Sequence, residues 1–126
     1  MIGSLYNVRA LGSADIPLLR QLNRLFGEAF CDDKTYGKHA PSDRYLETLL
    51  AKEHIVVIAA LTEGIVVAGL VAYELQKLES ERSEFYIYDL AVDAGHRRRG
   101  LATALIDRLR EFANQLGSGI IFVQAD

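Results

Sequence analysis

The sequence of 126 residues has one cysteine and lacks both a long hydrophobic run and a recognisable targeting signal. A single cysteine excludes an internal disulfide and a cysteine metal cluster, and we expect Cys31 to be a small buried or half-buried side chain. The longest apolar stretch, Ile65–Tyr73, falls far short of the roughly 20 residues that cross a membrane. The N-terminal segment lacks the basic and apolar regions of a signal peptide. These absences predict a cytoplasmic protein that does not enter a membrane.

Positive charge is also scarce, because 14 Lys and Arg against 17 Asp and Glu leave a formal net charge of −3. A general nucleic-acid-binding protein is expected to be basic, so we predict no nucleic-acid partner. The acidic residues gather at Asp32–Asp33 and in Glu79–Glu84. These segments are either solvated loops or a rim whose field attracts a cationic substrate. The three histidines lack the spacing of metal ligands, and no metal is expected.

Apolar periodicity predicts one α/β domain over residues 1–126, starting with a short strand at Tyr6–Ala10. Apolar residues at helical spacing from Leu18 to Phe30 predict the first helix, and Cys31–Ser42 is predicted to be a loop. Ser42 is then placed to cap a second helix that carries Tyr45–Leu50.

Three β-rich segments follow, at His54–Leu61, Ile65–Leu75 and Glu84–Val92. The first two are separated by Thr62–Gly64, which is a hairpin signal. An amphipathic helix after Gly100 and the continuously apolar strand Ile120–Val123 predict a right-handed parallel crossover. We therefore expect a mixed sheet with antiparallel strands first and a parallel strand–helix–strand unit last.

The segment "GHRRRGLATAL" places Arg97–Arg99 directly before Gly100 and an apolar helical pattern. A helix that begins at Gly100 points unpaired backbone N–H groups and the positive end of its dipole at the preceding turn, which favours a bound phosphate. Gly95 and Gly100 have the spacing of a P-loop, but Leu101 and Ala102 stand where that motif needs Lys and Ser or Thr. The dinucleotide fingerprint G-x-G-x-x-G is also absent, so neither motif explains the turn.

What remains is R-x-x-G-x-A, directly after a strand that reads "LAV". This pattern resembles the pyrophosphate-binding motif of the GNAT superfamily of N-acetyltransferases, written Q/R-x-x-G-x-G/A. The resemblance implies the α/β GNAT fold and acetyl-coenzyme A as cosubstrate. In that family the strand before the turn splays from its parallel neighbour, and the pantetheine arm lies in the gap. The residues that the resemblance assigns to coenzyme binding are Leu90, Ala91, Val92, Arg97, Arg98, Arg99, Gly100, Leu101, Ala102 and Thr103.

A narrower resemblance covers nearly the whole chain. The segments "FGEAF", "TYGKHAPSDRYLETLL", "RSEFYIYDLAV", "HRRRGLATALI" and "FVQAD" are similar to the type I aminoglycoside 3-N-acetyltransferases. This similarity implies direct acetyl transfer, in a ternary complex, to the 3-amino group of a deoxystreptamine antibiotic such as gentamicin. It also implies a role in antibiotic resistance.

Asp89 is the leading candidate for the group that receives the amine. A carboxylate in a cleft attracts an ammonium and accepts or relays its proton, and an unpaired carboxylate within an apolar strand is otherwise unfavourable. Strict alternation places Asp89 on the same face as Phe85 and Ile87. The resemblance gives Asp89 contact with the substrate amine, although a buried Asp can also simply bond backbone N–H groups. Glu84 is the second catalytic candidate, and Tyr36 is expected on the substrate side.

The sequence departs from the resemblance at its end, because the family continues beyond "VQAD" with a helix that carries a tyrosine general acid. We therefore expect a chain that lacks the family's C-terminal segment, and two alternatives stay open. The chain could bind coenzyme A without activity of its own, or it could acetylate a polyamine or another small amine. The apolar row Ile120–Val123 would then form an uncovered edge, which predicts association, most simply as a homodimer.

Overall fold

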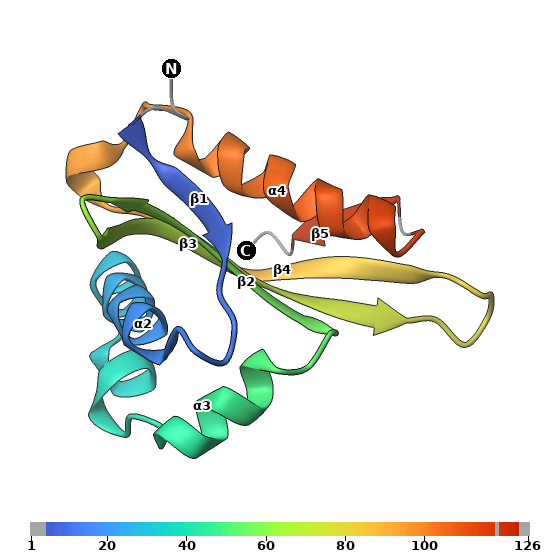
Figure 1. Cartoon of the computed structure of the whole chain (residues 1–126), viewed down its shortest axis with the longest axis horizontal. Helices are drawn as coiled ribbons and strands as arrows, with labels where there is room; N and C mark the ends of the chain where they lie inside the picture. Colours follow the sequence, from blue (N-terminus) through green and yellow to red (C-terminus); the bar gives the residue numbers. More distant parts are fainter. Residues whose placement is uncertain (1–4, 118, 124–126) are drawn as a thin grey trace.

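The computed structural model describes residues 5–117 and 119–123 as a five-stranded mixed sheet with helices on both faces (Figure 1). The strand order is β1-β2-β3-β4-β5. Residues 124–126, which complete the "FVQAD" segment, lie outside the described residues. In chain order the elements are β1 (Asn7–Ala10), α2 (Ile16–Phe30), the π-helix η1 (Lys34–Lys38), α3 (Asp43–Leu50), β2 (Ile55–Thr62), β3 (Ile65–Gln76), β4 (Ser83–Val92), the 3₁₀-helix η2 (Ala94–His96), α4 (Leu101–Gln115) and β5 (Ile120–Val123).

The topology confirms the predicted mixed α/β fold. The strands β1 to β4 pair antiparallel, and β4 pairs parallel with β5 after the α4 crossover. Thr62 pairs with Ile65, so the β2–β3 hairpin has a two-residue turn, Glu63–Gly64, in which both residues have positive φ, 51° and 77°. These are the angles of a type I′ turn. Every helix in the described part of the chain is too short to span a bilayer.

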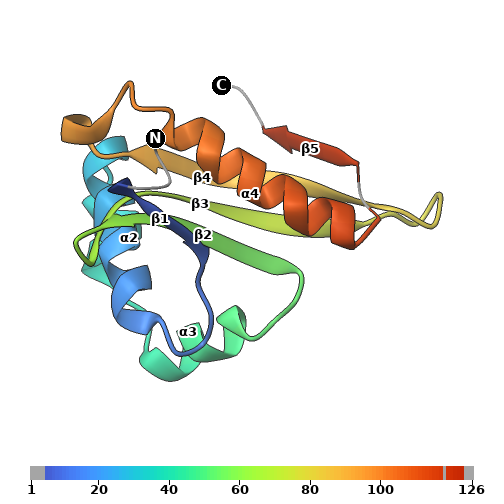
Figure 2. The same ribbon diagram turned by 45° about the horizontal axis from the view of Figure 1, so that its top comes forward.

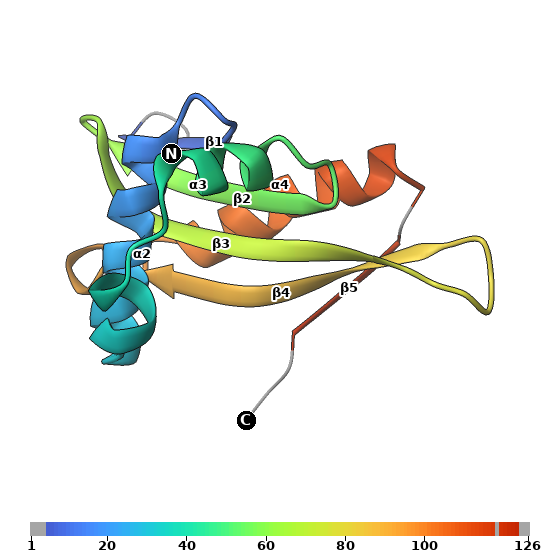
Figure 3. The same ribbon diagram turned by 90° about the horizontal axis from the view of Figure 1, so that it is seen from below.

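The sheet separates two clusters of buried side chains, one under each set of helices (Figure 2). The α4 cluster contains Leu101, Leu105 and Leu109, which lie against the alternate sheet residues that face α4. The second cluster lies between the sheet and the helices α2 and α3, which Figure 3 shows in front of the strands. An added Cβ at Gly69 would collide with Leu22, so this glycine lets α2 approach β3 closely.

The two helices α3 and α2 begin differently. The Ser42 hydroxyl accepts a hydrogen bond from the backbone N–H of Tyr45, as predicted. The side chain of Asp15 at the start of α2 instead accepts from Gly12 N–H and Arg9. The prediction for Cys31 is wrong, because this residue is exposed in the left-handed turn that ends α2.

A β-bulge interrupts β4 and decides which side chains face which helices. Val71 pairs with Asp89 and Ala72 pairs with Ile87, so Tyr88 is an extra residue of β4 between the two pairs. A bulge of this kind disturbs the two-residue alternation of a strand and increases its local twist. The side chains after Tyr88 therefore follow the opposite parity from those before it.

The bulge corrects the predicted placement of Asp89. Phe85 and Ile87 point into the α4 cluster before the bulge, and Leu90 and Val92 pack against the same cluster after it. Asp89 lies on the other face, where it contacts η1. The prediction that Asp89 shares a face with Phe85 and Ile87 is wrong, because strict alternation does not hold across an extra residue.

Candidate active site

The arginine–glycine turn adopts a backbone conformation that requires glycine at its end. Gly100 is the N-cap of α4 with φ of 77°, a left-handed value that residues with a Cβ rarely adopt. Arg98, two residues earlier, has φ of 64°. No side chain of the described residues caps α4, so its first N–H groups and its positive dipole end are available to an anion. This geometry is compatible with the predicted anion site, which stays a prediction.

An open hollow of about 350 Å³ begins beside this turn. Its walls come from the end of α2, the last residues of β4 and the start of α4, and consist of Ala29, Phe30, Leu90, Ala91, Val92, Arg97 and Ala102. The lining is mostly apolar and includes the basic residue Arg97, which fits a pantetheine arm that packs against apolar side chains and ends in a pyrophosphate. The structure thus places Leu90–Val92 and Arg97 together, as the sequence predicted for a coenzyme site.

The parallel pairing of β4 with β5 covers only the first part of β4. It runs from Glu84 opposite Ile120 to Ile87 opposite Val123. The segment Tyr88–Val92 lies beyond the paired region that the structure describes, and its last three residues line the hollow. Within this segment, the backbone groups of Leu90–Val92 are the ones that the resemblance assigns to the pantetheine arm.

The three arginines of the turn have different surroundings. Arg97 lines the hollow, and its Nε donates to the Val92 carbonyl at 3.4 Å. Arg99 donates from Nη1 to the hydroxyl of Tyr6 at 3.0 Å. Arg98 is exposed in the left-handed region. The sequence grouped these residues as one basic cluster, whereas the structure gives the exposed Arg99 a partly buried contact with Tyr6.

Asp89 lies on the sheet face opposite α4 and is bonded by a residue of the loop region. The Tyr36 hydroxyl donates to its Oδ1 at 2.9 Å, so the two predicted substrate-side residues are brought together across 53 positions of sequence. Tyr36 is held by Phe26 and Phe30, whose ring centroids lie 5.8 Å away. An added Cβ at Gly27 would lie 3.3 Å from Tyr36 Cβ, so a glycine there lets η1 approach α2. The sequence analysis did not predict η1, which lies in the expected loop.

Burial sets the electrostatics of this pair. It raises the pKa of the half-buried Asp89 carboxyl above its ordinary value, and the Tyr36 hydrogen bond opposes that rise. Burial, followed by the hydrogen bond and charge of Asp89, also raises the pKa of the Tyr36 hydroxyl well above its usual range. Tyr36 therefore stays a hydrogen-bond donor, and Asp89 is a better proton acceptor than an exposed carboxylate.

Aromatic rings extend from Asp89 along the same face. Tyr73 and Tyr88 lie 5.9 Å apart, Tyr86 and Tyr88 lie 6.1 Å apart, and Tyr86 stacks on Phe122 at 4.9 Å. We call these four residues the aromatic row. Tyr88 is 56% exposed. The sequence analysis missed the row, because the bulge at Tyr88, which places this residue on the face of Asp89, was not visible in the residue pattern.

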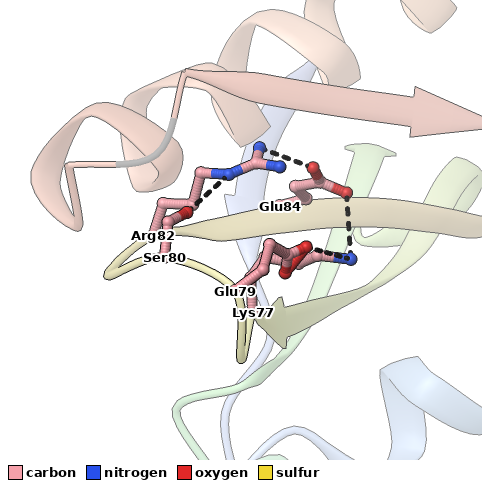
Figure 4. A network of polar contacts seen from close by, with 5 residues as sticks. All are labelled: Lys77, Glu79, Ser80, Arg82 and Glu84. Carbon is pink, nitrogen blue, oxygen red and sulfur yellow. Dashed lines mark hydrogen bonds and ion pairs between the residues drawn. The ribbon is translucent and has the colours of Figure 1, made fainter.

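Glu84, the second catalytic candidate, lies apart from this group at the start of β4 (Figure 4). Its carboxylate pairs with Arg82 at 2.7 Å and with Lys77 at 4.0 Å. Asp89 is five positions further along β4, and because Tyr88 is an extra residue, this equals four residues of the partner strand β3, about 13 Å at the usual rise. The structure does not bring Glu84 together with Asp89 and Tyr36. Among the described residues, no group of His, Cys, Asp and Glu is arranged to hold a metal.

Comparison with known proteins gives a family and two close structural relatives. The sequence model of the Acetyltransferase (GNAT) family matches residues 19–126. An aminoglycoside acetyltransferase from an uncultured soil metagenomic sample is 49% identical, with a TM-score of 0.93 over 96% of this chain and 80% of that one. Another from such a sample, solved with sisomicin, is 35% identical, with a TM-score of 0.88 over 100% of this chain and 81% of its own.

A more distant structure shares the fold alone. An aminoglycoside N-acetyltransferase in complex with CoA is 16% identical, with a TM-score of 0.73 over 96% of this chain and 77% of that one. No curated protein matches the chain. The family match, together with relatives above 30% identity, shows that this chain belongs to the acetyltransferase (GNAT) family.

Proposed function

We propose that this protein transfers the acetyl group of acetyl-coenzyme A to an amino group of an aminoglycoside. The observation that carries the proposal is the position of Asp89, half-buried and hydrogen-bonded to Tyr36 on the same end of β4 that lines the hollow. The relative solved with sisomicin, at 35% identity, supports the same acceptor class. The narrower proposal, the 3-amino group of deoxystreptamine, follows from the sequence resemblance.

The residues of the hollow and the turn hold the coenzyme in this proposal. Leu90–Val92 and Ala102 provide an apolar wall for the pantetheine arm, and the first amides of α4 with Arg97 receive the pyrophosphate. Acetyl-coenzyme A supplies an acetyl thioester, which is the electrophile of the reaction. Because the turn and Asp89 lie at the same end of β4, the protein holds donor and acceptor side by side.

Asp89 acts on the acceptor amine. Its carboxylate attracts the ammonium and accepts or relays the proton that must leave before the nitrogen lone pair can attack. The raised pKa makes Asp89 a stronger base, and the Tyr36 hydroxyl fixes the direction of the carboxylate. The aromatic row presents ring faces beside it, which attract further ammonium groups of a polycation.

A linear polyamine is the second candidate acceptor, because a carboxylate beside ring faces attracts any flexible polycation. Acetyl transfer measured with gentamicin, sisomicin and spermidine separates the two acceptor classes. Turnover of the aminoglycosides with a kcat/KM well above that of spermidine is expected. Preference for spermidine would replace the proposal by the second candidate, and coenzyme binding without turnover of any amine would leave a coenzyme-binding protein.

The coenzyme site is tested separately by Gly100→Val. A branched side chain at φ of 77° is strained and stands at the start of α4, so binding of coenzyme A should be lost. Gly117→Val is the matched control, since Gly117 has φ of 73° at the other end of α4 with open space around it. Unchanged coenzyme affinity in a folded Gly100→Val protein would falsify the assignment.

A further inference from the structure

One buried hydroxyl contacts both sides of the arginine–glycine turn. Arg99 Nη1 donates to the Tyr6 oxygen at 3.0 Å, and the Tyr6 hydroxyl lies 2.9 Å from His96 Nδ1. The two bonds share one oxygen, which accepts from Arg99 and also bonds the ring nitrogen of His96. The ring of Tyr6 also meets the ring of His96 edge-on, with centroids 5.8 Å apart. These contacts join residues that are 90 and 93 positions apart.

The two contacts flank the strained residue of the turn. Arg98 has φ of 64°, and a non-glycine residue in the left-handed region persists only where its surroundings hold it. His96, two residues before Arg98, and Arg99, directly after it, are both bonded to Tyr6, so the hydroxyl restrains the chain on both sides of Arg98. The next residue is Gly100, which starts α4.

Tyr6 is a fixed anchor, because its ring is part of the protein core. It is 5% exposed, directly precedes β1 and belongs to the same cluster as Leu101 and Leu105 of α4. A buried hydroxyl needs hydrogen-bond partners, and the turn provides them. Tyr6 also lies before residues 19–126, the span that the family model matches.

We propose that Tyr6 is a positioning residue for the pyrophosphate of the coenzyme. Through His96 and Arg99 it holds the turn in the conformation that directs the first amides of α4 at the anion, a role that rests on the coenzyme site proposed above. Without the hydroxyl the turn relaxes before the coenzyme binds, and affinity for the phosphates falls. Parts of the coenzyme that do not reach the turn bind as before.

The test is Tyr6→Phe, which keeps the buried ring and removes only the hydroxyl. The dissociation constant of coenzyme A, measured by calorimetry, should rise by about threefold to tenfold, which corresponds to the net free energy of about one ordinary hydrogen bond. That of pantetheine, which carries no phosphate, should stay the same. In acetyl transfer the KM for acetyl-coenzyme A should rise while kcat at saturation is retained. Tyr45→Phe removes an exposed tyrosine hydroxyl on α3 and should leave the coenzyme A affinity unchanged.

A second substitution keeps the test informative. Arg99→Gln removes the same hydrogen bond from its other partner, so the losses in coenzyme A affinity from Tyr6→Phe and Arg99→Gln should be less than additive when combined. Coenzyme A affinity within twofold of wild type in Tyr6→Phe overturns the inference, and so does equal weakening of pantetheine. A wild-type protein that binds no coenzyme A would instead overturn the proposed coenzyme site.

Discussion

The two faces of the sheet differ in the kind of side chain that covers them. The α4 face is apolar and closed, with Leu101, Leu105 and Leu109 almost fully buried. The opposite face is also apolar under α2, but toward β4 it changes to tyrosines around the half-buried Asp89, and Tyr88 is largely exposed. Both faces contribute buried side chains to stability, and only the second leaves polar and aromatic groups open to a ligand.

A single extra residue allows β4 to serve both faces. Without the bulge at Tyr88, strict alternation would direct Asp89 into the α4 cluster and turn Leu90 and Val92 away from it. An unpaired carboxylate among leucines is unfavourable, and two apolar side chains would lose their burial. The bulge is therefore the arrangement that satisfies both halves of β4, and it places Asp89 beside Tyr36.

The largest expected effect on the free energy of unfolding comes from a substitution in the closed α4 face. Leu105→Ala removes a fully buried side chain under α4 and should lower the free energy of unfolding by about 2 to 5 kcal/mol. Tyr88→Ala removes more atoms from the open face but should lower it by less than about 1 kcal/mol, because Tyr88 is 56% exposed. Urea unfolding of both variants measures the difference. Equal losses would mean that the two faces do not differ in the way described.

The next effect concerns chemistry on the open face. Asp89→Asn keeps the size of the side chain and the acceptor for Tyr36 but removes the negative charge, so kcat/KM for the amine should fall by about 100-fold or more. Coenzyme A affinity should be retained. The control is Asp107→Asn, which removes an exposed carboxylate from α4. If Asp89→Asn retained the wild-type kcat/KM toward every amine, the proposed role of Asp89 would be refuted.

Tyr36→Phe should have a smaller effect on rate and a distinct effect on pH dependence. The Tyr36 hydrogen bond lowers the pKa of Asp89, so its removal raises that pKa further. The acid limb of the kcat/KM profile should therefore move to higher pH, and the plateau rate should fall by about tenfold as the carboxylate loses its orientation. An acid limb that does not move would mean that a group other than Asp89 causes it.

The smallest effect is expected at the far end of β4. Glu84→Gln breaks the ion pairs with Arg82 and Lys77, which are partly exposed, so stability should fall by less than about 1 kcal/mol. The kcat with a saturating amine decides whether Glu84 is also catalytic. We expect kcat to be retained, because Glu84 lies far from Asp89. A loss of kcat as large as that in Asp89→Asn would mean that Glu84 is catalytic.

Most of the fold was predictable because each element has its own local signal. The periodic leucines of α2 and α4, the Ser42 cap and the Glu63–Gly64 turn all lie where the sequence indicated. The start of α4 was also predictable, since a glycine after three arginines opens an amphipathic helix. These signals depend on neighbouring residues and need no knowledge of tertiary contacts.

The parts that were not predictable depend on contacts between distant segments. The bulge at Tyr88 follows from competition between two clusters that form only when the sheet is complete. The bond between Tyr36 and Asp89 needs η1, a π-helix held against α2 near Gly27. The hydrogen bond from Arg99 to Tyr6 joins residues that are 93 positions apart. Local sequence patterns cannot show these contacts, because the partners lie far apart in the sequence.

The half-buried carboxylate of Asp89 couples proton binding to substrate binding. Its pKa is raised in the folded protein, so its neutral form stabilises the fold at low pH, and this contribution is lost as the pH rises through the folded-state pKa. At neutral pH the ionised group therefore opposes folding. A bound polycation compensates that charge and competes with the proton for the same oxygen atoms. The acceptor should thus stabilise the protein against heat more strongly at neutral pH than in acid, and its binding near the pKa of Asp89 should release protons into the buffer.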